Sequence, residues 1–446
     1  MSPSTVHIVH CVDTEGPLSE SLKATFERLN SIFGIDLKPR LKTLLHLQKK
    51  RIDLGGLEDQ VAKVVDPVLL NYNSTWEQID EMLEELLSKK FRNFLPDSFG
   101  NGWVYNWHCM DHVGFLKNPR RRDLGYHKIV DRYIAALEQS DSVQDGLHFH
   151  HHPVPMTRAA NDPATHFFSH TPVIFEIFAR RIIERQLFAC VHRPGFHSTR
   201  PDSHWFLEQY IPFEVANQAT DEDYSAFKDL AAGRFGDWRR APKNWQPYHP
   251  SHDDYQVPGQ CRRSIARSLN LGTRARLLSE NDVKQAFQEA KEGKQVILSF
   301  NHHDFRDMRP DIISVRELIF QVSKQFHDVP YKYSEAREAF RATLGLVPNE
   351  QLKFDVNWDK DRMHVVAKTK IFGPQPFLAI KTKSKQFFHD NFDFQIPFQE
   401  WTYNFDTITY PLSELETIGF AANDPTGNTT VVNIDGATKI VTQVSH

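Results

Sequence analysis

Short apolar runs alternate with stretches of helical spacing over the first 330 residues. Period-two and β-branched runs predict strands, whereas apolar residues every three or four positions predict helices. The predicted strands are Val6–Val12, Trp103–Cys109, Leu147–His150, Leu187–Val191, Phe213–Asn217 and Gln295–Phe300. The predicted helices include Trp76–Leu87, Tyr126–Leu137, Val173–Gln186, Glu280–Glu292 and Val315–Phe326. Such alternation is typical of a parallel sheet covered by helices, and about seven repeats suggest a closed or nearly closed barrel.

The pattern changes after residue 330, where short apolar segments are separated by Gly, Pro, Asn and Asp with little helical spacing. This predicts antiparallel strands at His364–Ala367, Phe377–Ile380, Thr407–Tyr410 and Thr430–Ile434. We therefore expect an α/β barrel domain at residues 1–330, with a helical insert at about 38–100, and a β-rich accessory domain at 331–446.

Polar clusters follow five of the predicted strands. In (β/α) barrels the functional side chains collect at the carboxyl ends of the strands, so these clusters predict one shared site. The clusters are Asp13 with Glu15, His108 with Asp111, His148–His152, His192 with Arg193, and His302–Asp304.

The segment His148–His152 holds four histidines, and imidazole is the commonest metal ligand in proteins. In a strand His148, His150 and His152 share one face, but the first and last lie roughly 13 Å apart, too far for one ion. Two solutions remain open. Either His148 and His150 form the ligand pair, or the chain bends before Pro153 and brings His152 back beside His148.

Composition limits the class of protein. Apolar residues make up 40% of the chain, enough for real cores, and the net charge of −4 argues against a general nucleic-acid binder. The four cysteines are scattered, without metal-ligand or disulfide spacing, so we expect reduced thiols. No long apolar run and no signal-peptide pattern is present, which predicts a cytoplasmic protein without a transmembrane segment.

Five motifs in order resemble the NodB-homology polysaccharide deacetylase family, also called carbohydrate esterase family four. The resemblance covers roughly residues 5–330. The motifs are Val12–Pro17, His148-x-x-x-His152-Pro153, Arg193–Phe196, Asp237-Trp238 and Leu298–Asp304.

This resemblance implies a distorted (β/α) barrel of NodB type with one divalent metal ion. Asp13, His148 and His152 would bind the ion, with His150 as the fallback ligand, and Zn²⁺ is expected ahead of Co²⁺, Ni²⁺ or Fe²⁺. Such an ion polarises an acyl carbonyl and lowers the pKa of a bound water.

The resemblance also implies the catalytic roles. Arg193 would orient the base, Asp237 would tune a partner, and His303 or His302 would protonate the leaving amine. Variant members of the family write the first motif as Asp-x-Asp, in which the first Asp is the base and the second a ligand. Cys11 stands at the first of these positions here, so either Glu15 substitutes as base or the reaction is altered or lost.

Further polar and aromatic residues near strand ends are expected to contact substrate: His108, Asp111, Trp238 and His302. The expected activity is removal of an acyl group from an N-acylated sugar, a small molecule or lipid-linked, in surface polysaccharide (O-antigen-type) biosynthesis. Two alternatives stay open: a hydrolase of another non-peptide C–N bond, and a catalytically lapsed barrel that binds glycan. The C-terminal domain could pair copies of the chain into a homo-oligomer.

Overall fold

Seven parallel strands form a closed barrel in the computed structural model, which describes residues 4–117, 124–160, 162, 173–222, 235–348 and 350–446. Neighbouring strands pair in sequence order, and β1 closes the barrel by pairing with both β7 and β2. The strands are β1 (Val6–Thr14), β2 (Tyr105–Met110), β3 (Gly146–His151), β4 (Val191–Pro194), β5 (Phe213–Asn217), β6 (Ser264–Asn270) and β7 (Val296–His303). A short strand, β8 (Tyr331–Tyr333), pairs with the start of β1.

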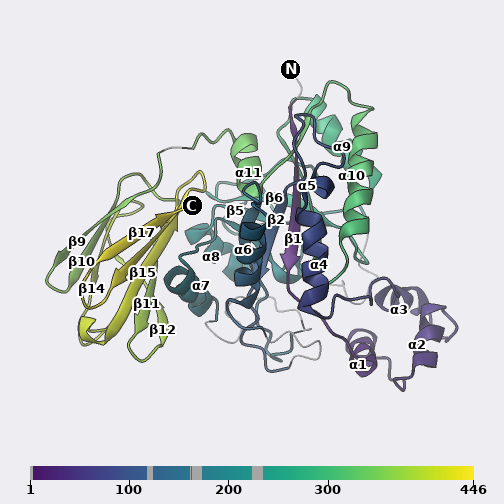
Figure 1. The fold of residues 1–446 in the computed structure, drawn as a ribbon, viewed down its shortest axis with the longest axis horizontal. Coiled ribbons are helices and arrows are strands. Elements are labelled where there is room, and N and C mark those ends of the chain that lie inside the picture. The colour runs from purple at the N-terminus through teal and green to yellow at the C-terminus, as the bar shows by residue number, and fades with distance from the viewer. Residues whose placement is uncertain (1–3, 118–123, 161, 163–172, 223–234, 349) are drawn as a thin grey trace.

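Amphipathic helices surround the barrel (Figure 1). They are α4 (Trp76–Leu87), α6 (Lys128–Gln139), α7 (Val173–Arg185), α8 (Pro201–Tyr210), α9 (Glu280–Lys291) and α10 (Arg309–Ser323). Apolar residues of α4, α9 and α10, such as Leu83, Val283 and Ile312, share one buried cluster with Trp107 and Leu298 of the strands. The predicted barrel is thereby confirmed.

Helix α11 (Ala336–Leu344) packs against the interior of the barrel near the starts of its strands (Figure 1). Its residues Ala336 and Phe340 join a buried cluster with Val9 and Val191, and the rings of Phe340 and Phe213 stack at 4.6 Å. The opposite end, where the strands finish, is therefore the end available for a site.

Helices between β1 and β2 form a separate lobe next to that end (Figure 1). α1 (Leu22–Phe33), α2 (Leu41–Gln48) and α3 (Glu58–Val64) enclose their own apolar cluster, which includes Phe26 and Leu47. The first helix begins at Leu22, ahead of the predicted start of the insert near residue 38, because Ser21 caps it. α4 and the short α5 (Lys89–Arg92) then lead back to the barrel.

Two antiparallel sheets make up the C-terminal part. One has the order β13-β14-β10-β9 and the other β12-β11-β15-β16-β17, and buried residues such as Val365, Ile380 and Trp401 form a shared core. The strands are β9 (Phe354–Asp359), β10 (Arg362–Ala367), β11 (Phe377–Thr382), β12 (Phe387–Asp390), β13 (Asp393–Ile396), β14 (Glu400–Asn404), β15 (Leu415–Asn423), β16 (Thr429–Asp435) and β17 (Val441–Ser445). The predicted β-rich C-terminal region is confirmed.

Two strand predictions are wrong. Residues 407–410 form an exposed bend, in which the Asp406 carboxylate accepts from the backbone N–H groups of Ile408 and Thr409. The strand predicted at Leu187–Val191 begins only at Val191, because Leu187 still closes the end of α7 through a backbone bond to Arg181.

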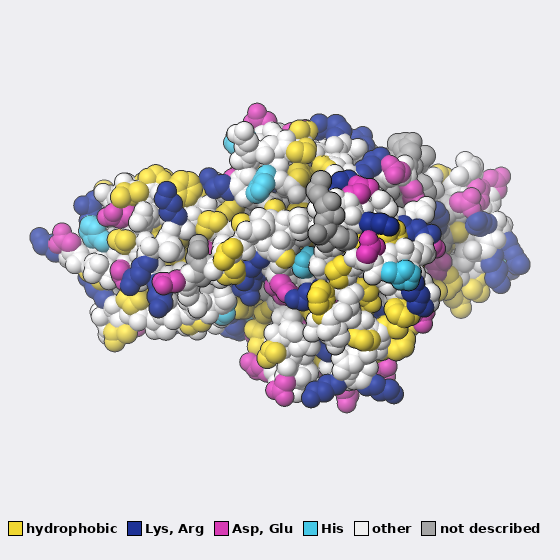
Figure 2. Space-filling model, turned by 90° about the horizontal axis from the view of Figure 1, so that it is seen from above, with side chains coloured by type: hydrophobic (Ala, Val, Ile, Leu, Met, Phe, Trp, Pro, Cys, Tyr) yellow, Lys and Arg dark blue, Asp and Glu magenta, His cyan; other side chains and the backbone are white. Residues whose placement is uncertain are grey.

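The second C-terminal sheet rests on α7. Phe178 of that helix packs with Phe377 of β11 and Ala421 of β15, and Asn423 donates from Nδ2 to the carbonyl oxygens of Ala189 and Tyr210. On the face shown in Figure 2, basic and acidic side chains are interspersed. Among the described residues, no helix has the length and apolar character needed to cross a bilayer.

Candidate metal centre and active site

A cavity of about 650 Å³ opens at the carboxyl ends of the barrel strands. Its floor includes Asp13 and Glu15 from the end of β1, His150 and His152 from the end of β3, and His303 from β7. Helix α1 of the lobe between β1 and β2 contributes to its outer wall. Active sites of (β/α) barrels form at this end of the barrel.

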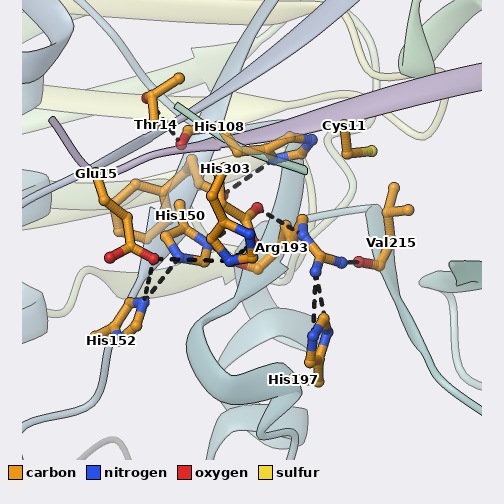
Figure 3. A network of polar contacts seen from close by, with 12 residues as sticks. Cys11, Thr14, Glu15, His108, His150, His152, Arg193, His197, Val215 and His303 are labelled. Carbon is orange, nitrogen blue, oxygen red and sulfur yellow. Dashed lines mark hydrogen bonds and ion pairs between the residues drawn. The ribbon is translucent and has the colours of Figure 1, made fainter. Parts of the chain in front are cut away.

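Glu15, His150 and His152 form a buried group whose potential ligand atoms all lie within 4.8 Å of one another. The Nε2 atoms of His150 and His152 are 2.9 Å apart, and Nε2 of His152 is 3.5 Å from Oε1 of Glu15 (Figure 3). Two neighbouring chain segments supply the whole group: Glu15 directly follows β1, His150 lies in β3, and His152 directly follows β3.

The backbone of β4 selects the tautomer of His150. Nδ1 of His150 lies 2.8 Å from the carbonyl oxygen of Arg193. A carbonyl can only accept, so Nδ1 carries the hydrogen and Nε2 presents a lone pair toward His152 and Glu15. Burial lowers the pKa of His150 well below its usual value, which keeps the ring neutral. Metal-binding histidines are commonly oriented in this way.

This donor set fits a divalent metal ion. Two imidazole nitrogens and one carboxylate form the two-histidine, one-carboxylate triad that leaves positions open for water and substrate. Nitrogens bound tetrahedrally to one Zn²⁺ at its usual bond length lie roughly 3.3 Å apart. The Nε2 atoms of His150 and His152 lie 2.9 Å apart, a few tenths of an ångström closer than that.

Gly195 makes room for His152. A Cβ atom at position 195 would lie 2.4 Å from Cδ2 of His152, so only glycine allows the ring to lie there. The next two residues, Phe196 and His197, adopt positive φ angles of 52° and 53°. Left-handed backbone at non-glycine residues is a strain that concentrates at functional sites.

The backbone of Glu15 is held on both sides. The Asp304 carboxylate accepts from the N–H of Glu15 at 2.8 Å and from the N–H of Gly16 at 3.0 Å, and the Tyr133 hydroxyl donates to the same carboxylate at 2.9 Å. His112 donates from Nε2 to the carbonyl oxygen of Glu15 at 3.0 Å. Asp304 ends the polar cluster His302–Asp304 that follows an apolar strand, but its hydrogen bonds to the backbone of Glu15 were not predicted.

Asp13 is paired with Arg193. Nε of the fully buried Arg193 donates to Oδ1 of Asp13 at 2.6 Å, while its Nη1 and Nη2 contact the carbonyl of Val215 and the ring of His197. Burial raises the pKa of Asp13 to about 6, although Arg193 opposes that change. Asp13 was predicted as a metal ligand. In the structure Oδ1 of Asp13 accepts a hydrogen bond from Arg193, and the carboxylate of the metal-binding group comes from Glu15.

His148 corrects a second ligand prediction. Its Nε2 lies 3.0 Å from Oε1 of Glu335 and 3.2 Å from Oδ1 of Asn106, deeper in the barrel than His150. Burial by itself lowers the pKa of His148. Cys190 and Glu335 outweigh this effect and raise the pKa above its usual value, to about 9. His148 is thus the cation of a buried ion pair beside α11. Two residues along a strand advance about 7 Å, so His148 lies too deep to share an ion with His150 and its partner His152.

Three residues predicted to bind substrate lie outside the cavity. Nε2 of His302 contacts Oδ2 of Asp311 at 2.9 Å on the outer face of β7, because neighbouring strand residues point to opposite faces. The carboxylate of Asp111 binds Arg181 of α7 at 2.9 Å. His108 points into the barrel but is fully buried below the cavity, with Nδ1 3.5 Å from the carbonyl oxygen of Phe149.

The fourth predicted motif also lies away from the floor of the cavity. Asp237 pairs with the exposed Arg239 at 2.8 Å, and this hydrogen bond lowers the pKa of Asp237 to about 2. Trp238 is buried and donates from Nε1 to the carbonyl oxygen of His197 at 2.9 Å. It therefore supports the strained loop instead of stacking on a ligand.

The chain matches no protein-family model and no curated protein. Among solved structures it is similar to a Cellulomonas fimi endo-beta-1,4-mannanase double mutant, with 8% identity and a TM-score of 0.22, over 81% of this chain and 89% of that one. A TM-score this low supports no inference, so the fold and the site rest on their own geometry.

Proposed function

We propose that the chain is a metal-dependent, NodB-like deacetylase that removes an acyl group from an N-acylated sugar. The observation that carries the proposal is the buried group of Glu15, His150 and His152, in which the carbonyl of Arg193 leaves a lone pair on Nε2 of His150. These residues would hold one divalent ion, with Zn²⁺ expected first. When bound, the ion polarises the acyl carbonyl and lowers the pKa of a water.

Asp13 is the base in this proposal. Asp13-Thr14-Glu15 then corresponds to the Asp-x-Asp of variant family members, with Asp13 in the first place and Glu15 as the ligand in the second. Arg193 holds Asp13 through Oδ1, so the second oxygen is left to accept a proton from the attacking water. This replaces our expectation that Glu15 acts as the base.

Cys11 does not stand in the place of the base. Its Sγ lies 3.7 Å from Oγ of Ser299 inside the barrel, and burial raises the pKa of the thiol to about 12. Because Cys11 lies one inward-facing position deeper than Asp13, its presence no longer argues for a catalytically lapsed barrel.

His303 is the acid in this proposal. Its Nε2 lies 3.6 Å from Oδ2 of Asp13 and 3.9 Å from Oε1 of Glu15, so a proton taken up by Asp13 has an imidazole beside it. Burial lowers the pKa of His303 well below its usual value, and a ring that gains a proton in this setting releases it readily. The acceptor is the leaving amine.

The proposed substrate, an N-acylated sugar of surface polysaccharide biosynthesis, is supported by the cavity. Phe196, Phe305 and Tyr72 line it, and aromatic rings offer apolar faces for a sugar ring. A cytoplasmic location, a division into two domains and pairing of copies through the C-terminal domain remain part of the proposal. β8 and α11, which follow the boundary expected at residue 330, pack with the barrel.

Metal analysis combined with an acyl-release assay tests the proposal. We expect about one equivalent of metal per chain and release of acetate from at least one member of a panel of N-acetyl sugars. His150→Ala and His152→Ala should lose both, whereas His252→Ala, which removes an exposed imidazole, should lose neither. Two results would overturn the proposal. One is wild-type protein that contains no metal and binds none when a divalent metal is added. The other is acetate release that is unchanged in His150→Ala. Release of an acyl group only from non-sugar amides would favour the alternative hydrolase.

A further inference from the structure

Basic side chains gather in the outer part of the cavity, although the whole chain carries a net charge of −4. The acidic residues on the floor, Asp13 and Glu15, are occupied by Arg193 and by the proposed ion. Away from the floor the lining contains two acidic residues, Glu27 and Asp162, and five basic ones: Arg28, Lys117, Arg274, Arg276 and Arg306.

Arg274 and Arg276 lie on the loop that follows β6. Arg276 is buried and donates from Nη1 to Oε1 of Gln218 at 3.1 Å and to the carbonyl oxygen of Phe235 at 2.9 Å. The guanidinium of Arg274 lies 5.5 Å from the ring centroid of the same Phe235. Contacts to one residue therefore bring both arginines to one wall of the cavity.

Arg306 lies on the loop that follows β7, the neighbouring strand of the barrel. Its Nε donates to the carbonyl oxygen of Leu69 at 3.0 Å, and its guanidinium lies 4.8 Å from the ring of Phe305 and 5.4 Å from that of Tyr72. These contacts orient a planar donor group, and an arginine held in this way loses little further freedom on binding an anion.

Aromatic rings connect these arginines with the metal-binding group. The ring of His152 contacts Phe196 at 4.7 Å, and Phe196 contacts Phe235 at 5.3 Å, beside Arg274. On the other side the ring of His303 contacts Phe305 at 4.8 Å, beside Arg306. Aromatic rings therefore lie between the guanidinium groups of Arg274 and Arg306 and the reacting end of the cavity.

We infer that the outer part of the cavity binds a phosphate group on the N-acylated sugar through Arg274, Arg276 and Arg306. This inference rests on the proposed function for the sugar at the reacting end. A phosphate has several charged oxygens around one centre and can accept from guanidinium groups on two loops, whereas a planar carboxylate pairs best with one. A sugar phosphate and a nucleoside diphosphate sugar share this chemistry.

Calorimetric titration of the full chain separates these possibilities. The probes are N-acetylglucosamine, N-acetylglucosamine 1-phosphate, uridine diphosphate N-acetylglucosamine and the carboxylate-bearing N-acetylmuramic acid. We expect at least about tenfold tighter binding of a phosphorylated probe than of the neutral sugar, and weakening of this preference by salt. Tightest binding of the monophosphate or of the nucleotide sugar identifies the source of the phosphate.

Variants make the test specific. The double variant Arg274→Ala/Arg306→Ala should lose about tenfold or more of the affinity for the phosphorylated probe and keep that for the neutral sugar. Arg362→Ala, an exposed arginine on β10, is the matched control and should change neither. Equal affinities for neutral and phosphorylated probes, preference for the carboxylate, or equal losses for both sugars in the double variant would overturn the inference.

The His152→Ala variant distinguishes failure of this inference from failure of the proposed function. A wild type that releases no acyl group can still prefer phosphorylated sugars, as can His152→Ala. In that case only the proposed function fails. If the wild type releases acetate but binds neutral and phosphorylated sugars equally, only the inference fails.

Discussion

His150 and Arg193 are joined across the neighbouring strands β3 and β4, where Nδ1 of the histidine donates to the carbonyl oxygen of the arginine at 2.8 Å. The side chain of the same Arg193 holds Asp13 at 2.6 Å. One residue therefore orients both a proposed ligand and the proposed base. The register of two strands consequently determines the chemistry of the site.

His150 and His148 should give opposite results when replaced by alanine. His150→Ala removes a donor of the group and should abolish stoichiometric metal binding. His148→Ala should retain the metal but lower the free energy of unfolding by about 2 kcal/mol, because Glu335 loses a charged partner and keeps Arg337 and the N–H groups of Arg337 and Glu338. Metal analysis and urea denaturation measure the two effects. Loss of metal in His148→Ala alone would contradict this assignment.

The stability contributed by Glu335 should disappear in acid. Burial alone would raise the pKa of this carboxyl, but His148 lowers it to about 2. A carboxyl whose pKa is lower in the folded chain stabilises it above the unfolded value near 4.3 and loses this effect as the pH falls toward the folded value. Wild type should therefore exceed Glu335→Gln in stability near neutral pH. The difference in urea midpoints should shrink between about pH 5 and pH 3; a difference independent of pH would refute the ion pair.

Gly195→Ala should weaken metal binding without unfolding the chain. The added Cβ would lie 2.4 Å from Cδ2 of His152 and push the ring away from His150. Displaced orientation of a ligand commonly costs about tenfold to a hundredfold in metal affinity. Competition with a chromophoric chelator measures this loss. Gly100→Ala is the control: it meets no atom within 4 Å, costs about 1 kcal/mol for its positive φ, and should leave the affinity unchanged.

Asp304 should act as a positioning residue for Glu15. Asp304→Ala removes the acceptor for the N–H groups of Glu15 and Gly16, so we expect about tenfold weaker metal binding as well as lower stability. Asp304→Asn retains one acceptor oxygen and should restore much of the affinity. Tyr133→Phe removes a single hydrogen bond to the carboxylate and should have the smallest effect. Loss of stability with unchanged metal affinity in Asp304→Ala would reduce its role to packing.

Cys11 should be dispensable for activity. Cys11→Ser keeps a small polar group opposite Ser299 and should retain acyl release within about threefold of wild type, since the thiol stays protonated at neutral pH. Cys11→Asp should destabilise the chain by placing an unpaired carboxylate in the barrel, and should not increase activity. An increase in the rate of acyl release in Cys11→Asp would restore the interpretation that a base is missing from wild type.

Much of the barrel could be predicted because its signals are local. β1 and β7 are largely apolar runs ending in polar residues, β3 alternates apolar residues with histidine, and α6, α7 and α9 have helical spacing, so their types follow from neighbouring positions. β6 was missed because its sequence SIARSLN carries buried Arg267 and Ser268, which look solvent-exposed without their partners. A buried strand can contain polar residues when ion pairs and hydrogen bonds satisfy their side chains. Its sequence pattern then resembles that of an exposed segment.

By itself, the sequence determined the alternation of strands and helices, the β-rich C-terminal part, and the position of acidic and histidine residues at strand ends. Only the tertiary structure decided which of them meet. Closing the barrel places His150 beside Arg193, sends His148 toward Glu335 and turns His302 outward. Side-chain direction alternates with every residue, so the choice among adjacent histidines depends on where each strand ends and on partners distant in the chain.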